Sequence, residues 1–390
     1  MLPYVTTAAY YLSFIILGLT TAITGPSLLT LGEHTSSGYE SISFIFIFGS
    51  LGYIIGSYLG GRAYDRIPAH KLIVVTLLIL GVATALIPLS RSLEVLFSAM
   101  FLSGLVSGII DVGGNTLIIW MHGRKAGPFL NGLHFFFGVG SLIAPFLLGQ
   151  ILPKTGDVLW AYLIFSILCL PAAIWLWFLP DPPRQTNMAD ENSSAPFPLA
   201  PVVLIVILFL LYVGLELGFG HWIYTYTLTL GLGTITSAAN LNGFFWGSFT
   251  LGRLLGVWVS TRLRSQMILY LDILGCAISI TTIMLWKESS LALWIGTIGL
   301  GISMASIFPT FIILSGERIQ ITGTITGLFL VGSGAGGMLL PWLLGQIFAH
   351  TGPQAMTTVL LITLAGLFLV LLRFINLKIP ELPKPNTVKN

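Results

Sequence analysis

Residues 147–151 of the chain read LLGQI, and the same five residues return unchanged at positions 343–347, which lie 196 residues later. Two glycines and a proline recur at the same offset, since Gly138, Gly140 and Pro145 correspond to Gly334, Gly336 and Pro341. Identities at one constant spacing indicate an internal repeat. The sequence therefore predicts two halves that share one order of elements.

Apolar stretches long enough to cross a membrane run along both halves. Of the 390 residues, 55% are hydrophobic and only 8% are charged, whereas a soluble protein carries roughly 25% charged residues. A helix needs about 20 apolar residues to cross a bilayer. We therefore expect an all-α membrane protein with twelve transmembrane helices, near residues 5–30, 41–60, 71–90, 93–120, 127–151, 158–179, 201–226, 237–258, 267–286, 290–315, 322–348 and 354–376.

The repeat divides the chain into two six-helix bundles, at residues 1–179 and 201–390, joined by a linker at 180–200. An even number of spans gives both halves the same orientation, so they are related by an axis along the membrane normal. In that architecture the substrate binds between the halves near the middle of the bilayer. The spans leave no room for a sizeable soluble domain, and no catalytic arrangement of residues is seen, so we expect no enzyme.

The distribution of basic residues predicts the orientation. Only Arg91, Lys154 and Lys287 of the seventeen lysines and arginines lie in the joints after odd-numbered spans. Because positive residues gather on the cytoplasmic side, both termini are expected in the cytoplasm, with the chain in the inner (plasma) membrane. The net charge is only +3 and the basic residues are scattered, which argues against nucleic-acid binding. Cys169 and Cys276 lie in apolar spans, so we expect no disulfide, no metal site and no cofactor apart from a coupling ion.

The loop after the second span is a candidate cytoplasmic gate. Residues 60–71 read GGRAYDRIPAHK, and Asp65 can sit against a helix N-terminus or an arginine of the other half. With Arg62 and Arg66 it would latch this side shut. The alternative is that these charges only anchor the loop in the cytoplasm.

Acids inside spans are costly in hydrocarbon and are therefore functional candidates. Asp111 lies in the fourth span, and Asn115 follows one helical turn later on the same face. Asn131 and His134 share a face of the fifth span, and His134 is expected at a depth similar to that of Asp111. A carboxylate near an imidazole makes a proton-binding pair, so both residues are candidates for cation coupling. A satisfied structural pair is the alternative.

Glu216 of the seventh span is the second acid, and it is a candidate for cation coupling or substrate binding. Trp222 follows it, and the eighth span adds Asn240, Asn242 and Trp246 at a similar depth. Carboxylate and amide groups bond sugar hydroxyls, while a Trp ring covers the apolar face of a sugar. A helix–helix hydrogen bond for Glu216 and a membrane-interface role for the Trp residues are the alternatives.

Asp272 of the ninth span is the third acid. It is expected in the cytoplasmic third of the membrane, level with Arg253 of the eighth span. We therefore predict a structural ion pair between Arg253 and Asp272.

Three stretches resemble one branch of the major facilitator superfamily, the fucose:proton symporters and their sodium-dependent glucose transporter relatives. They are DVGGN at 111–115, LNGLHFFFGVGS at 130–141, and YVGLE at 212–216 with Gly220 and WIY at 222–224. The loop at 60–71 resembles the superfamily's cytoplasmic signature, although Pro68 replaces its second glycine. The resemblance implies cation coupling and sugar binding at Asp111 and Asn115, and sugar contact at Asn131.

One departure from this branch is visible. The fucose carriers have a carboxylate in the first span, whereas this chain has only hydroxyl groups there: Thr20, Thr21, Thr24 and Ser27. A single proton site or a different cation therefore stays open. The expected function is symport of a sugar or similar polyol, coupled to protons or sodium, by a carrier that works as a monomer.

A proton-coupled exporter or flippase of amphipathic compounds or lipids is the alternative function. The pair Ala144-Pro145, with Gly140 and Gly149 nearby, resembles a fifth-span element of drug antiporters. The same proline and glycine recur at Pro341 and Gly345, so close helix packing also explains them. A cavity lined by amides, hydroxyls and Trp predicts a sugar, and a wide apolar cavity predicts a lipid or drug.

Overall fold

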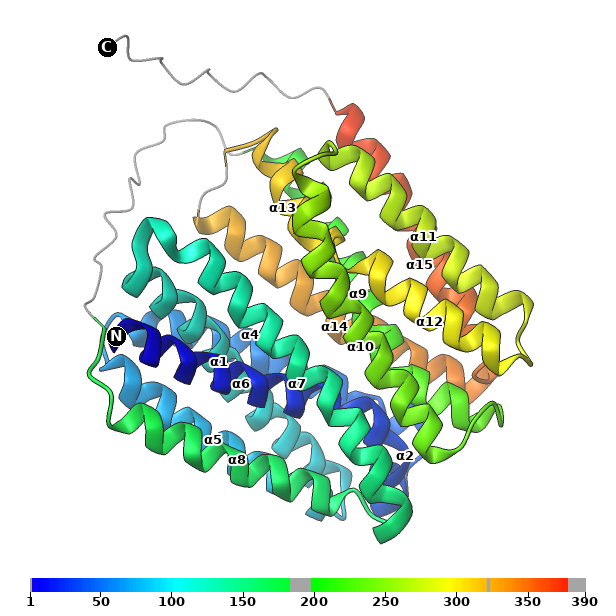
Figure 1. Ribbon diagram of the computed structural model, residues 1–390. Helices are drawn as coiled ribbons and strands as arrows, with labels where there is room; N and C mark the ends of the chain where they lie inside the picture. Colours follow the sequence, from blue (N-terminus) through cyan, green and yellow to red (C-terminus); the bar gives the residue numbers. More distant parts are fainter. Residues whose placement is uncertain (1, 183–197, 321–322, 378–390) are drawn as a thin grey trace.

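The computed structural model describes residues 2–182, 198–320 and 323–377, which form two bundles of helices side by side (Figure 1). The first bundle contains α1 (Leu2–Ala22), α2 (Thr24–His34), α3 (Tyr39–Ile42), α4 (Phe44–Tyr64), α5 (Ala69–Leu89), α6 (Leu93–His122), the short η1 (Gly123–Lys125), α7 (Ala126–Thr155) and α8 (Leu159–Trp177). The second contains α9 (Leu199–Thr229), α10 (Ile235–Ser260), α11 (Ser265–Leu285), α12 (Ser290–Met304), α13 (Ile307–Gly316), α14 (Gly323–Thr351) and α15 (Ala355–Asn376). Most of the predicted linker at 180–200 falls outside the described residues.

Eleven helical segments among the described residues are long and apolar enough to cross a membrane, and they match eleven of the predicted spans. The remaining prediction, at 237–258, falls on α10, a helix of 26 residues that packs between α7 and α12. This helix carries Asn, Ser, Thr and Arg side chains, which lower its hydropathy. The all-helical fold class predicted from composition is therefore confirmed.

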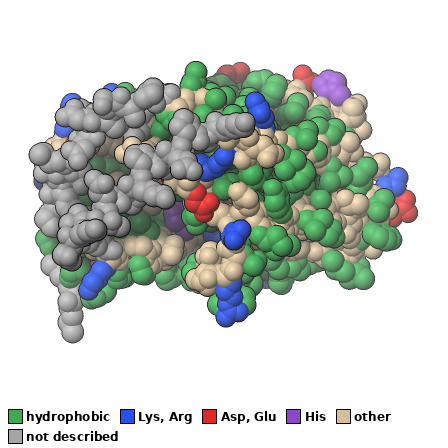
Figure 2. Space-filling view, turned by 90° about the horizontal axis from the view of Figure 1, so that it is seen from above, with side chains coloured by type: hydrophobic (Ala, Val, Ile, Leu, Met, Phe, Trp, Pro, Cys, Tyr) green, Lys and Arg blue, Asp and Glu red, His purple; other side chains and the backbone are tan. Residues whose placement is uncertain are grey.

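The sides of the bundles are apolar, as lipid contact requires. Leu285 and Leu369 are each 66% exposed, and Phe178 is 80% exposed. Figure 2 shows hydrophobic side chains over much of the visible surface, with few charged groups among them. Large apolar surfaces are unfavourable in water, so these exposed side chains fit contact with the hydrocarbon of a bilayer.

Three predicted spans are interrupted, the second of them at Ser43 between α3 and α4, and a proline explains each of the other two interruptions. The first span divides at Ile23 into α1 and α2, and Pro26 cannot donate a hydrogen bond to the carbonyl of Ala22, four residues earlier. The tenth span divides into α12 and α13 at Ala305-Ser306, and Pro309 likewise has no N–H for Ala305. The extents of both spans were predicted, but their division into two helices was not.

The repeated glycines bring equivalent helices together in the two bundles. A Cβ atom on Gly140 of α7 would overlap the carbonyl oxygen of Ile15 in α1. In the second bundle, a Cβ atom on Gly336 of α14 would overlap the carbonyl oxygen of Leu210 in α9. Only glycine permits such close backbone contact, so the sequence repeat reflects one helix-packing contact used twice.

Contacts between the bundles gather at the end where α2 and α9 finish, which we call the contact end. There the hydroxyls of Tyr39 and Thr229 lie 3.2 Å apart, and Gln346 donates a hydrogen bond of 2.9 Å to the carbonyl oxygen of Glu40. The orientation predicted from the basic residues would put this end outside the cell.

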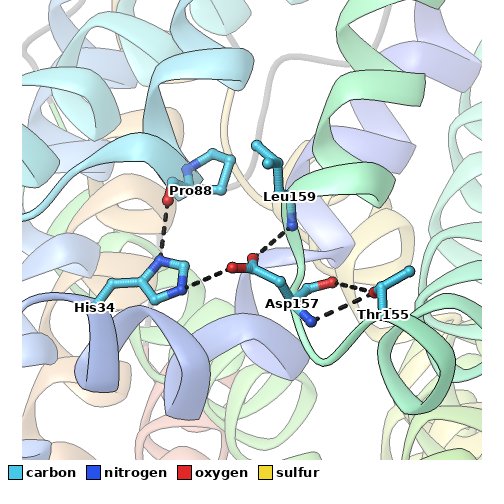
Figure 3. A network of polar contacts seen from close by, with 5 residues as sticks. All are labelled: His34, Pro88, Thr155, Asp157 and Leu159. Carbon is cyan, nitrogen blue, oxygen red and sulfur yellow. Dashed lines mark hydrogen bonds and ion pairs between the residues drawn. The ribbon is translucent and has the colours of Figure 1, made fainter.

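A polar network holds α2 within its own bundle at the contact end (Figure 3). His34 places Nδ1 2.9 Å from the carbonyl oxygen of Pro88 and Nε2 3.1 Å from the Asp157 carboxylate. The other oxygen of Asp157 accepts a bond of 2.8 Å from the N–H of Leu159, and the Thr155 hydroxyl donates to the Asp157 carbonyl. The network ties the end of α2 to α5 and to the turn between α7 and α8.

Candidate transport site

Asp111 of α6 is held by side chains from two helices. The Tyr53 hydroxyl of α4 donates a short hydrogen bond to Asp111 Oδ2, and the Asn115 amide donates to Oδ1 at 3.1 Å. The same amide donates to the backbone oxygen of Asp111 at 2.9 Å, as residues one helical turn apart can. Both carboxylate oxygens therefore face donors, and all three side chains are only partly buried.

Asn131 and His134 are exposed side chains on α7. The His134 ring meets Phe14 of α1 edge to face, with centroids 6.3 Å apart, and a Cβ atom on Gly114 of α6 would overlap the same Phe14 ring. Phe14 therefore lies against both α6 and α7. Among the described residues no hydrogen bond or ion pair joins His134 to Asp111, so the proton-binding pair stays a prediction.

Glu216 of α9 is buried, with only 9% of its surface exposed. The hydroxyl of Tyr212 lies beside it but donates its hydrogen bond to the carbonyl oxygen of Met304, at 2.9 Å. The nearest charge acting on Glu216 is that of Arg253, whose guanidinium stacks over the Phe249 ring at 4.5 Å. Glu216 is thus a buried acid with a cation in its surroundings.

Arg253 of α10 also acts across the boundary between the two bundles, because its charge reaches His134 of α7. The two helices approach closely here, since a Cβ atom on Gly138 would overlap the Thr250 hydroxyl. One cation therefore faces polar groups of both bundles.

The predicted Arg253–Asp272 ion pair is not present. Among the described residues no carboxylate lies within ion-pair distance of Arg253, while Asp272 accepts a hydrogen bond of 2.6 Å from the Ser306 hydroxyl. The prediction used the depth of the two residues but not the faces of their helices. Asp272 faces the interruption between α12 and α13, and Arg253 faces α9 and α7.

The amide and indole groups predicted on α10 include polar atoms without a protein partner. Asn242 is completely buried and donates a bond of 2.5 Å to the carbonyl oxygen of Gly220, but its Oδ1 has no partner among the described residues. The same holds for Asn240 Oδ1 and for Nε1 of Trp246, which is 3% exposed. Buried polar atoms are normally paired, so these three atoms remain available to water or a polar ligand.

Trp222, in contrast, has a packing role in this conformation. It is completely buried, and its indole N–H donates a bond of 2.8 Å to the carbonyl oxygen of Pro341. Its ring lies 4.5 Å from that of Phe348. The predicted sugar contact is therefore not accessible at Trp222 in this state.

The predicted cytoplasmic gate lies at the end opposite to the contact end. Asp65 follows the last residue of α4, and Arg66 follows it in the turn before α5. The guanidinium of Arg62 stacks over the ring of Tyr58, one turn earlier, at 4.2 Å. Since the bundles meet at the other end, the latch remains a prediction for the state in which this end closes.

Sequence reasoning missed Tyr53 and Ser57, which line the face of α4 nearest Asp111. Tyr53 lies 58 residues before Asp111 in the sequence, so the contact between them depends on how two separate helices pack. The available signal was the spacing of Tyr53 and Ser57, one helical turn apart, beside Gly52 and Gly56 at the same face.

Comparison with known proteins places these features in a family. Residues 10–341 match the model of the Major Facilitator Superfamily. Sodium-dependent glucose transporter 1 of Xenopus laevis is 30% identical, over 84% of this chain and 72% of that protein. Sodium-dependent glucose transporter 1A of Mus musculus is 27% identical, over 87% and 89% respectively. Major facilitator superfamily domain-containing protein 4A of Homo sapiens is 26% identical, over 98% and 94%.

Two solved structures share the fold. The D-xylose-proton symporter superimposes with a TM-score of 0.79 at 15% identity, covering 98% of this chain and 99% of that one. A point mutant of the nucleoside transporter NupG gives a TM-score of 0.71 at 15% identity, covering 94% and 99%. These findings confirm the predicted fold and agree with the expectation that the chain is not an enzyme. The chain therefore belongs to the Major Facilitator Superfamily, in the branch of the sodium-dependent glucose transporters.

Proposed function

We propose that the chain takes up a sugar or similar polyol by symport with a cation, either a proton or sodium. The observation that carries the proposal is the carboxylate of Asp111 inside α6, held by Tyr53 and Asn115, in a chain whose relatives are named sodium-dependent glucose transporters. A carboxylate within a span is costly unless it binds a partner or an ion. The structural likeness to a D-xylose-proton symporter supports the same class of substrate.

The proposed cycle is alternating access of two halves, residues 1–179 and 201–390, that rock about the site between them. We further propose that the chain has twelve spans with both termini in the cytoplasm. It would work as a monomer in the plasma membrane. With the proposed orientation, the contact end is the outer end, and it is closed in the present state. Closure of the other end brings Asp65 with Arg62 and Arg66 toward the second half.

In the site, Asp111 binds the coupling cation, and Asn115 and Asn131 face the sugar from the first half. His134 and Glu216 are further candidates for the coupling step, with the charge of Arg253 near both. From α10, three residues offer hydrogen bonds to sugar hydroxyls through polar atoms that have no partner in the described part of the chain: Asn240, Asn242 and Trp246.

Transport into proteoliposomes tests the proposal. The purified chain is reconstituted, and uptake of labelled hexoses, pentoses and polyols is followed under an imposed proton or sodium gradient. The expected result is gradient-driven sugar uptake that Asp111→Asn uncouples, with the exposed loop variant Glu288→Gln behaving as the wild type. If folded wild-type protein accumulates no sugar under either gradient, the sugar proposal fails and lipids and exported amphiphiles become the substrates to test.

A further inference from the structure

His34 lies between two hydrogen-bond acceptors at the end of α2 (Figure 3). Its Nδ1 is 2.9 Å from the carbonyl oxygen of Pro88, and its Nε2 is 3.1 Å from Asp157 Oδ2. A carbonyl oxygen has no hydrogen to give, so Nδ1 must donate to Pro88. A neutral imidazole has only one N–H, and its Nε2 would then turn a lone pair towards a carboxylate oxygen. The contact with Asp157 is therefore a bond only when a second proton lies in the gap between Nε2 and Oδ2.

The surroundings hold this gap in place and leave it within reach of water. Asp157 Oδ1 accepts a bond of 2.8 Å from the N–H of Leu159, which keeps Oδ2 turned towards His34. The side chains of His34 and Asp157 are 11% and 33% exposed. Among the described residues, Asp157 is the one charged group within ion-pair distance of His34. The other charged groups near this end of the first bundle form no ion pair in the described part of the chain: Glu33, Glu40, Arg91, Glu94 and Lys154.

The contact occurs in the half of the chain whose first span is broken. At the repeat offset of 196 residues, Leu230 and Pro353 take the places of His34 and Asp157, so the second half has no such pair. There α9 is one continuous helix from Leu199 to Thr229, whereas α2 is separated from α1 at Ile23. A continuous helix holds its own end through its backbone hydrogen bonds. The separate α2 depends more on side-chain contacts.

The position of α2 matters because this helix packs against the other bundle. A Cβ atom on Gly25 would lie 2.6 Å from the carbonyl oxygen of His221 in α9. Leu29, one turn later, packs against Tyr224 of α9. His221 is the titratable side chain nearest to this contact on α9, and Gly25 lies nine residues before His34. Opening of the contact end requires α2 to part from α9.

We propose that the gap between His34 and Asp157 binds a regulatory proton, and that this proton locks α2 to the first bundle. The inference rests on the alternating access of the proposed function, but not on its substrate or coupling ion. With the proton bound, α2 moves with the first bundle and leaves α9 when the contact end opens. Without it, the end of α2 is released from Asp157 and stays against α9. In the proposed orientation the proton comes from outside the cell, so acid outside favours opening.

The sign of the pH dependence follows from the two bonds of His34. Histidine side chains ordinarily titrate between about pH 5 and 8. Below this range both bonds are made, and above it the bond to Asp157 is lost while the one to Pro88 remains. Partly exposed ion pairs are weak, so we expect the end of α2 to open about twofold to fivefold more often in alkaline solution.

The substitution Asp157→Asn should reverse this dependence. An asparagine in the same place accepts from Leu159 N–H through Oδ1 and donates through Nδ2 to a neutral Nε2. His34 is then fully bonded in alkaline solution, whereas in acid two N–H donors face each other. A contact that only packs α2 in place would show no such reversal.

Hydrogen–deuterium exchange of the purified, full-length protein measures the release of α2. Exchange of its backbone amides is compared at about pH 5.5 and about pH 8.5, on either side of the ordinary histidine range, and the unfolded protein corrects for the chemical effect of pH. In the wild type we expect corrected exchange about twofold to fivefold faster at the higher pH, and His34→Gln should remove the difference. His350→Gln is the matched control, because His350 lies at the same end and bonds the carbonyl oxygen of Gln346 at 2.8 Å, with no carboxylate partner among the described residues.

Two results would overturn the inference. One is equal corrected exchange of α2 at both pH values in the wild type, and the other is an Asp157→Asn variant with the same pH dependence as the wild type. If His34→Gln does not accumulate as folded protein, the reversal in Asp157→Asn still decides the matter. Sugar uptake enters none of these measurements, so the proton lock can fail while the symport proposal stands, and the reverse.

Discussion

Two buried tryptophans allow one substitution to be compared in two hydrogen-bond environments. Trp222 and Trp246 are 0% and 3% exposed, and both belong to the second bundle. The indole N–H of Trp222 bonds the carbonyl oxygen of Pro341 at 2.8 Å, whereas that of Trp246 has no partner among the described residues. Replacing either residue by Phe leaves a cavity of similar size, so the cavity cost largely cancels between the two variants.

The difference in stability then comes from the N–H group. Trp222→Phe loses a hydrogen bond with a net value of about 0.5 to 1.5 kcal/mol. Trp246→Phe removes a buried donor whose missing bond costs about 1 to 3 kcal/mol, so it recovers part of its cavity cost. We therefore expect Trp222→Phe to be less stable than Trp246→Phe, by on the order of 2 kcal/mol or more.

For sugar binding we expect the larger effect at Trp246, not at Trp222. If Trp246 Nε1 bonds a sugar hydroxyl, Trp246→Phe raises the KM for uptake about tenfold, the value of one hydrogen bond. Trp222→Phe should leave the KM nearly unchanged in the protein that remains folded, because its indole N–H bonds the backbone.

Unfolding can be followed with a maleimide dye, since both cysteines, Cys169 and Cys276, are buried and free in the folded chain. Melting curves of the two variants give the order of stability, and uptake assays give the two KM values. Equal losses of stability at the two positions would refute the hydrogen-bond reasoning. An unchanged KM in Trp246→Phe would show that this indole does not contact the sugar.

Three further predictions concern other parts of the structure. Asp272→Leu should lower stability by about 1 to 3 kcal/mol, because it leaves a serine hydroxyl unpaired at the α12–α13 interruption, while Asp272→Asn keeps an acceptor there. Asp157→Asn should cost at most about 1 kcal/mol, because the His34–Asp157 pair is partly exposed, and melting curves measure both effects. Gly140→Val should abolish accumulation of folded protein on detergent chromatography, whereas Gly61→Val, with no neighbour within 4 Å among the described residues, should be tolerated.

The fold was predictable because apolar length and the internal repeat are local properties of the sequence. Eleven of the predicted spans coincide with apolar helices, and the repeated glycines mark one helix contact used in both bundles. The division of the first span at Ile23 was missed, although Pro26 carries the signal, because the span was assigned from its apolar length alone. Hydropathy reports burial in lipid, whereas the interruption depends on one missing backbone N–H.

The candidate site was predictable only where its residues share a helix. Asp111 and Asn115 are four residues apart, and the hydrogen bond between them follows from that spacing. Tyr53 was not predictable as their partner, because its place depends on how α4 packs against α6. The Arg253–Asp272 pair failed for the same reason, since equal depth in the membrane does not determine which faces of two helices meet.

Asp111 and Glu216 differ in their electrostatic surroundings, and this difference argues for separate roles. Glu216 is buried and lies in the field of Arg253, which is permanently charged, although the two residues form no ion pair among the described residues. Asp111 has hydrogen-bond donors around it but no ion-pair partner among the described residues. A transported cation binds most favourably beside a carboxylate that no basic side chain of the protein neutralises. Asp111 therefore stays the proposed binding residue for the transported cation, and Glu216, near the charge of Arg253, stays a candidate for contact with the substrate.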